Sequence, residues 1–210
     1  GSIVITSFMV SMSKGLGLDN FGFDAWIPVL ENSQYLDCIW RSLGYAFIAA
    51  TIGTILSLFV AYLSVKTHVK GRSLPDLLVM VGGSTPSVVI ALALIITFSG
   101  NYGLNLYSTM WILIVSYLVK YMTMSVRTIA ASLSQVSSSL EEAGLNSGAG
   151  WLRICKDIIM PLIAPSIVAG WFLIFMPSFY ELTMSNLLYG SDTQTIGVLL
   201  YELQTYADTQ

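Results

Sequence analysis

The sequence predicts an all-α fold, a polytopic integral membrane helix bundle with about four complete spans and partial helices at its two ends. Only 10% of the 210 residues are charged and 55% are hydrophobic, whereas a soluble domain carries about 25% charged residues on average. Four long apolar runs cross the sequence, and each approaches the ~20 residues that a helix needs to span a bilayer. The runs are continuous rather than alternating, which favours helices over a β-barrel.

The four expected spans follow one another along the chain. The first (residues 43–65) and the second (77–98) carry no charge. The third (110–126) carries a single lysine, Lys120, and the fourth (158–180) is again uncharged. Since water is absent from the hydrocarbon core, the backbone of each run must bond to itself, which predicts a helix.

The two ends of the chain are expected to be incomplete helices. Residues 3–12 are apolar but too short to span, and the apolar residues 195–201 lead into a polar tail. We therefore expect residues 1–210 to form one transmembrane domain that is a fragment, or most of one half, of a longer protein.

Lysine and arginine predict the orientation, because basic loops stay in the cytoplasm. The loop after the first span and the segment after the third span are basic: Lys66, Lys70, Arg72, Arg127, Arg153 and Lys156. The other side has two bases, Lys14 and Arg41, and a larger set of acids: Asp19, Asp24, Glu31, Asp37, Glu181, Asp192, Glu202 and Asp208. Segments 66–76 and 127–157 are therefore expected in the cytoplasm, and segments 13–37, 99–109 and 181–210 outside.

The longest cytoplasmic segment is expected to be a helix–turn–helix. Apolar residues at helical spacing predict an amphipathic extension of the third span: Ile129, Leu133, Val136 and Leu140. Ser138 and Ser139 precede Glu141 and Glu142 by three residues, a capping-box pattern that predicts the start of a helix.

The glycines of residues 148–150 predict a stop and a turn after this helix. A second helix is expected from four residues at helical spacing: Trp151, Ile154, Cys155 and Ile158. The apolar side of such a helix pair must be buried in the bilayer surface, against the membrane domain or in a groove of another protein.

This segment resembles the cytoplasmic signature of ABC-importer permeases, E-A-A-x3-G-x9-I-x-L-P. Here the motif begins with Glu142-Ala143-Gly144, continues after three residues with Gly148, and ends with residues 158–161, "IIMP". Gly144 replaces the second alanine and Met160 replaces the leucine. Glycine in place of alanine is expected to loosen the first helix by up to about 1 kcal/mol. Residues 180–204 resemble the segment before the last helix of ferric-iron permeases.

The resemblance implies the MetI-like permease fold of type I ABC importers, with residues 127–160 as the coupling-helix segment. In this family the segment docks on a cytoplasmic ABC ATPase dimer, and the implied docking residues are Glu141, Glu142, Ala143, Gly144, Gly148 and Trp151. The permease would catalyse no reaction and hold no cofactor, since ATP is bound by the partner; the chain has no G-x-x-x-x-G-K-[ST] phosphate loop.

The resemblance also implies a location in the bacterial inner membrane and further partners. These are a second permease half or subunit, an extracytoplasmic substrate-binding protein and the lipid bilayer, with no role for nucleic acid. Ferric iron is the expected substrate, and aminoethylphosphonate, thiamine and polyamines are alternatives because permeases for them are similar in the same region.

Two polar clusters border otherwise apolar spans and are candidates for the substrate path: Ser84, Thr85, Ser87, Ser178, Tyr180 and Glu181. Polar groups facing lipid are unfavourable, so these are expected to turn inward. Pro86 and Pro177 each free a backbone carbonyl nearby, and a wall rich in acceptors favours a cation. In the alternative interpretation the serines bond to their own helix and Glu181 points into water.

Other residues also have two interpretations. In the alternative to docking on the ATPase, Glu141 and Glu142 only cap a helix, and Gly148 only ends one. Lys120 is expected to reach the cytoplasmic interface, with a place in the path as the alternative. Residues 82–86, "GGSTP", predict close helix packing or a broken helix that lines a cavity.

Two other classes of function fit less well. A secondary transporter driven by an ion gradient usually needs a carboxylate within the membrane, and none occurs in the four runs. An intramembrane enzyme would need a catalytic cluster, and no paired aspartates, histidine cluster or G-x-S-x-G motif is present. Cys38 and Cys155 are expected on opposite sides of the membrane and so cannot pair.

Overall fold

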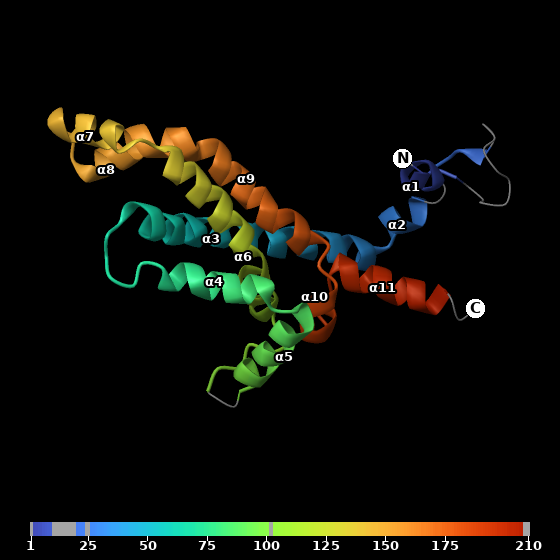
Figure 1. The fold of residues 1–210 in the computed structure, drawn as a ribbon. Helices are drawn as coiled ribbons and strands as arrows, with labels where there is room; N and C mark the ends of the chain where they lie inside the picture. Colours follow the sequence, from blue (N-terminus) through green and yellow to red (C-terminus); the bar gives the residue numbers. More distant parts are fainter. Residues whose placement is uncertain (1, 10–19, 24–25, 101–102, 208–210) are drawn as a thin grey trace.

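The computed structural model describes residues 2–9, 20–23, 26–100 and 103–207, and its regular elements are helices (Figure 1). Lys14, Asp19, Asp24 and Asp208, used above for orientation, lie outside the described residues. In chain order the helices are α1 (Ser2–Thr6), α2 (Ile27–Glu31), α3 (Ser33–Lys66), α4 (Leu74–Ser84), α5 (Ser87–Phe98), α6 (Met110–Gln135), α7 (Ser138–Asn146), α8 (Trp151–Ile154), α9 (Met160–Phe179), α10 (Thr183–Leu188) and α11 (Ile196–Ala207). A π-helical turn, Cys155–Ile159, joins α8 to α9.

The expected fold class is confirmed. Among the described residues, three helices are long and apolar enough to cross a membrane, namely α3, α6 and the continuous helix Trp151–Phe179. The bent pair α4 and α5 forms a fourth candidate span. Figure 1 shows α3, α6 and α9 running side by side, with α7 and α8 at one end of the bundle and α10 and α11 toward the other.

Small side chains on α3 bring the three long helices together. Ala46, Ala49, Ala50 and Ala61 are all fully buried. A Cβ atom on Gly53 would lie 2.7 Å from Cδ1 of Ile174 on α9. Small residues at such spacing allow close backbone approach, which drives association of helices in lipid.

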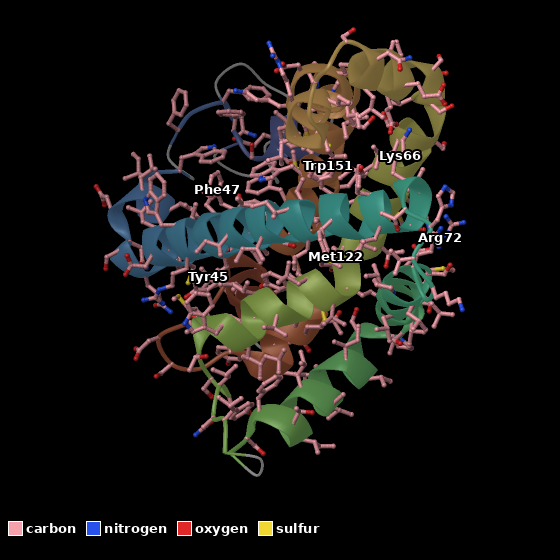
Figure 2. All side chains as sticks on the ribbon, turned by 90° about the vertical axis from the view of Figure 1, so that its left-hand side faces the viewer. Tyr45, Phe47, Lys66, Arg72, Met122 and Trp151 are labelled. Atoms are coloured by element: carbon pink, nitrogen blue, oxygen red, sulfur yellow. The ribbon has the colours of Figure 1, made fainter. Side chains whose placement is uncertain are left out.

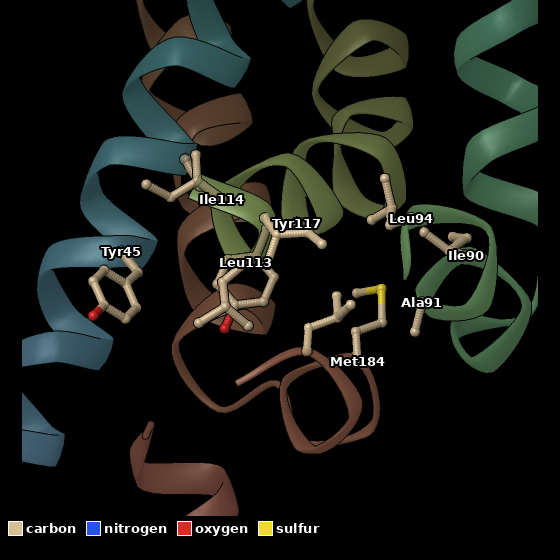
Figure 3. Packing of buried hydrophobic residues seen from close by; sticks show 11 residues of the cluster. Tyr45, Ile90, Ala91, Leu94, Leu113, Ile114, Tyr117 and Met184 are labelled. Carbon is tan, nitrogen blue, oxygen red and sulfur yellow. The ribbon is translucent and has the colours of Figure 1, made fainter. Parts of the chain in front are cut away.

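Two hydrophobic clusters fill the described part of the bundle, and the names outer and cytoplasmic follow the orientation expected from the basic loops. The outer cluster joins α3, α5, α6 and α10 through Tyr45, Ala91, Leu113, Tyr117 and Met184 among others, as Figure 3 shows. The cytoplasmic cluster joins α3, α6, α8 and α9. The cytoplasmic helix pair is therefore packed on the membrane domain and is not an independent unit.

The second apolar run is not one helix, which corrects the expected span 77–98. α4 ends at Ser84, α5 begins at Ser87, and the two axes differ in direction by 111°. Proline excludes the preceding residue from the helical region and has no N–H to continue the helix. Thr85 accordingly has φ −73° and ψ 136°, an extended conformation. The broken helix expected as an alternative is the one observed.

The cytoplasmic segment differs from expectation at its first helix. The extension of the third span ends at Gln135, so Leu140 belongs to α7 and is 43% exposed. Ser137 caps α7 and accepts a hydrogen bond from the N–H of Ser139 (3.3 Å), one position before the expected capping serines. The expected capping box is therefore wrong, because three residues after this cap stands a leucine.

The second cytoplasmic helix continues into the fourth span without a stop. Pro161 has no N–H for the carbonyl four residues earlier and would crowd it in an α-helix. The π-helical turn relieves this, since the N–H of Met160 donates to the carbonyl of Cys155, five residues back.

Candidate functional site

The turn of the cytoplasmic helix pair is built on Gly148. This residue has φ +77°, a conformation that glycine adopts without a Cβ penalty. The N–H of Gly148 donates to the carbonyl of Leu145 (2.9 Å), and the N–H of Ala149 donates to that of Gly144 (3.1 Å). These bonds satisfy the last carbonyls of α7 and reverse the chain toward α8.

Gly144 brings the two helices of the pair into contact. A Cβ atom at this position would lie 2.9 Å from Cγ1 of Ile154 and 3.3 Å from Cδ1 of Ile158. The glycine that was expected to loosen α7 therefore permits its packing on α8. A groove of about 470 Å³ lies along the seam and is lined by Leu140, Ala143, Gly144, Ser147, Ala149, Arg153, Ile154, Asp157 and Ile158.

Both helices of the pair are attached to the cytoplasmic end of α3. Nζ of Lys66 lies 2.5 Å from Oε1 of Glu141 on α7. Nε1 of Trp151, at the start of α8, donates to the hydroxyl of Tyr62 (2.8 Å), and the two rings meet edge to face. Figure 2 shows Lys66 and Trp151 on the side of α3 that faces the helix pair.

The implied docking residues differ in solvent exposure and in the side-chain contacts that they make within the chain. Glu142 and Ala143 are exposed, and Glu142 makes no hydrogen bond or ion pair with the described residues. Glu141 is committed to Lys66, and Trp151 is half-exposed while holding Tyr62. The adjacent apolar surface is open to a partner, with Leu145 57% and Leu152 75% exposed.

The ammonium group of a lysine side chain lies at the break between α4 and α5. Nζ of Lys120, on α6, donates to the carbonyls of Thr85 (2.8 Å) and Gly83 (3.3 Å). Lys120 therefore points to the break and not to the cytoplasmic interface, which corrects that expectation. Glycine allows the close approach, because a Cβ on Gly82 would lie 2.6 Å from the carbonyl oxygen of Val119.

The first candidate cluster for the substrate path lies at this break. The hydroxyls of Ser84 and Thr85 donate to carbonyls of their own helix, to Met80 (2.8 Å) and Val81 (2.7 Å). Ser87 is the first residue of α5 and is half-buried. The alternative interpretation, in which the hydroxyls bond to their own backbone, thus describes Ser84 and Thr85.

The second cluster lies at the outer end of α9. Ser178 is buried, and Tyr180 is 66% exposed. Glu181 is only 5% exposed, so it does not point into water. Its carboxylate accepts from the N–H groups of Met184 (3.0 Å) and Ser185 (2.8 Å), so it caps the start of α10.

Tyr117 links this second cluster to α6. Its hydroxyl lies 2.8 Å from that of Ser185, which in turn donates to Glu181 (2.9 Å). Tyr117 and Lys120 are three residues apart and therefore share a face of α6. One face of α6 thus contacts the first cluster directly, through Lys120, and the second cluster by way of Ser185.

Sequence reasoning missed the residues that hold these features in place. Lys66 was used only as a marker of orientation, and Tyr62 and Tyr117 were not distinguished from other apolar helix residues. A basic residue four positions after a tyrosine at the end of a span was the available signal for the Lys66 contact. No sequence signal pointed to Ser185.

A bundle of long apolar helices, with one broken span and a helix–turn–helix packed on one end, describes a polytopic membrane protein. The chain belongs to the family of binding-protein-dependent transport system inner membrane components, whose sequence model matches residues 53–210. The family expected from the cytoplasmic signature is thereby confirmed.

Sequence similarity to individual transport proteins supports this membership. The Fe(3+)-transport system permease protein FbpB 2 of Haemophilus influenzae is 33% identical over 188 residues, which are 84% of this chain and 36% of that protein. The spermidine/putrescine transport system permease protein PotC of Escherichia coli K12 is 24% identical over 96% of this chain and 75% of its own length. The chain thus spans about a third of the ferric permease.

Solved structures share the fold. A bacterial ABC transporter involved in the import of the acidic polysaccharide alginate matches with a TM-score of 0.73 and 15% identity, over 99% of this chain and 73% of that chain. The MetNI methionine ABC transporter in an inward-facing conformation matches with a TM-score of 0.61 and 16% identity, over 82% and 89%. These likenesses confirm the MetI-like fold.

Proposed function

We propose that this chain forms the membrane pathway of an ATP-driven importer, and that the helix pair α7–α8 docks on a separate ATPase. The exposed Glu142 beside the exposed leucines of the pair carries the proposal. A carboxylate and apolar side chains left open at the cytoplasmic end are suited to insertion in a groove of a partner. The solved relatives are ABC transporters, one of them bound to its periplasmic protein.

The proposed assembly has four parts besides the bilayer. Two permease halves or subunits enclose the path, a cytoplasmic ATPase dimer binds ATP, and an extracytoplasmic protein delivers the substrate. This chain supplies one half, with residues 127–160 as its coupling segment. It catalyses no reaction itself.

Purification of the full-length permease from its native membrane tests the proposal. A soluble ATPase subunit should purify with it, and uptake should persist when an ionophore collapses the ion gradients but stop when ATP is depleted. The opposite pattern would identify a secondary transporter. Replacement of Glu142 by alanine should weaken ATPase retention without loss of the permease from the membrane.

Ferric iron is the substrate that we propose, because the Fe(3+) permease FbpB 2 is more similar in sequence than the polyamine permease PotC. Polyamines are the second candidate, and aminoethylphosphonate and thiamine remain further alternatives. The argument for a cation from free carbonyls no longer holds at the break, since Gly83 and Thr85 accept from Lys120. Binding of Fe³⁺, spermidine and putrescine to the cognate extracytoplasmic protein would distinguish the first two candidates.

We further propose that the substrate crosses between the helix break and the outer end of α9. The residues concerned are Ser84, Thr85, Ser87, Ser178, Tyr180 and Glu181. Support comes from the position of both clusters against one face of α6. Cysteines at positions 84, 87 and 180 should change their accessibility to water-soluble thiol reagents when ATP is added; no change at any of them would place the path elsewhere.

A further inference from the structure

Two residues on one face of α3 hold both arms of the cytoplasmic helix pair. Tyr62 and Lys66 are four residues apart and therefore lie one above the other on the helix surface. Tyr62 accepts from Trp151 of α8, and Lys66 pairs with Glu141 of α7. A displacement of either arm thus acts on the end of α3.

The Lys66 contact also fixes the hinge between α6 and α7. Nζ of Lys66 donates to the carbonyl of Val136 (2.9 Å), the C-cap residue that follows α6, in addition to its pairing with Glu141. The Lys66 side chain is 11% exposed and that of Glu141 is 28% exposed. In an ion pair shielded from water in this way, removing one partner leaves the other charge uncompensated, which is strongly unfavourable.

The opposite end of α3 is attached to the segment that precedes α11. The hydroxyl of Ser42 accepts from the N–H of Ile196 (2.8 Å), and Nε2 of Gln34 donates to the side chain of Gln194 (3.3 Å). α3 has 34 residues and no internal proline, so it is a stiff rod of about 51 Å. It connects the cytoplasmic pair directly to the outer segment.

We propose that Tyr62 and Lys66 are positioning residues through which α3 carries movement of the α7–α8 pair to the outer face of the permease. This inference rests on the proposed function, since it requires an ATPase that moves the pair. Cys38 is a built-in reporter of the outer end of α3, because it is fully buried beside Gln194 (3.8 Å). A shift of α3 against that segment changes its accessibility.

The test uses the full-length permease with its co-purified ATPase in proteoliposomes. An impermeant thiol reagent applied from outside measures the labelling rate of Cys38, with and without ATP and vanadate. In the wild-type complex the two rates should differ by about fivefold or more, the size of a typical coupling. In Lys66→Glu the difference should disappear while ATP hydrolysis continues. Glu141→Lys should abolish the difference as well.

The charge-swapped variant Lys66→Glu/Glu141→Lys should restore part of the difference, because it re-forms the ion pair but not the hydrogen bond to the carbonyl of Val136. A general loss of stability would restore none of it. Lys70→Glu is the matched control, because Lys70 lies four residues after Lys66 in the loop that follows α3, is exposed and contacts no described residue through a hydrogen bond or ion pair. Tyr62→Phe keeps the ring and removes the hydrogen bond to Trp151, so it tests the second arm should the charge variants not fold.

Two results would overturn the inference. One is a Cys38 labelling rate that is the same in both nucleotide states of the wild-type complex. The other is an unchanged difference in Lys66→Glu, Glu141→Lys and Tyr62→Phe. Absence of any co-purified ATPase from the wild-type protein would instead reject the proposed function.

Discussion

Lys120 shows how a single charge is accommodated in an apolar helix. It lies about 15 Å along α6 from Met110, since each helical residue rises about 1.5 Å. Its ammonium group is stabilised by the two carbonyls that the break at Pro86 leaves without helix partners. The lysine and the proline are therefore one feature: the proline opens the helix, and the lysine satisfies the acceptors that are opened.

Replacement of Lys120 by methionine is expected to destabilise the protein by about 1–3 kcal/mol, because buried carbonyls would lose their donor. Lys120→Gln retains N–H donors at a shorter reach and should lose less. Thermal unfolding of the wild type and both variants in the same detergent measures the order of their stabilities. A methionine variant as stable as the wild type would show that water or lipid replaces the lysine without loss.

Gly148 is the second position where one residue decides local structure. Its φ of +77° is unfavourable for any residue with a Cβ atom, by about 1–2 kcal/mol. Gly148→Ala should therefore impair ATP-coupled uptake, and Gly148→Val should impair it more. Gly150→Ala is the control, since Gly150 has φ −70° and open space around it. Equal uptake in the valine variant and the control would contradict the role of the turn.

At the scale of elements, the cytoplasmic helix pair depends on its cap and on tertiary contacts more than on the helix propensity of its own residues. α7 has nine residues, too few to be a stable helix alone in water. It is stabilised by the cap at Ser137, by Lys66 of α3 and by packing on α8 through Gly144. The pair is therefore attached to the end of the bundle by side-chain contacts.

Gly144→Ala should destabilise the helix pair, although alanine is the residue typical of the family signature. Better helix propensity would contribute up to about 1 kcal/mol, but overpacking against Ile154 costs about 1–3 kcal/mol. Limited proteolysis between α7 and α8 should therefore be faster than in the wild type. A slower rate would mean that Ile154 changes its rotamer freely and that propensity decides.

At the scale of the whole molecule, the basic loops and the helix order predict one orientation. The end of α3, the helix pair and the start of α4 share the cytoplasmic side in this arrangement, and α11 lies toward the opposite, outer side (Figure 1). Arg127 lies beside Asp76 (3.4 Å), so even one expected cytoplasmic base is partly neutralised within the bundle.

Cys155 should react with impermeant thiol reagents only from the cytoplasmic side, and Cys38 only from outside. Cys38 should react slowly, because its side chain is fully buried, whereas Cys155 is partly exposed. Single-cysteine variants in sealed vesicles of both orientations provide the measurement. Reaction of both cysteines from the same face would reject the orientation.

The sequence by itself determined the class of fold, the three long spans, the turn at Gly148 and the family. These follow from local causes: long apolar runs must form helices in lipid, glycine ends helices, and a motif with fixed spacing carries the family resemblance. The break at Pro86 was expected only as an alternative to a continuous span over residues 77–98, and it too has a local cause, because proline acts on its own neighbours.

Only the tertiary structure decided which polar groups form hydrogen bonds and ion pairs with each other. Lys66 with Glu141, Lys120 with the carbonyls of the break, and Glu181 with the start of α10 depend on how the helices are placed. Spacing along one helix specifies a face but not the partner opposite it. Burial in lipid then fixes these pairs, because each polar group must find a donor or acceptor within the protein.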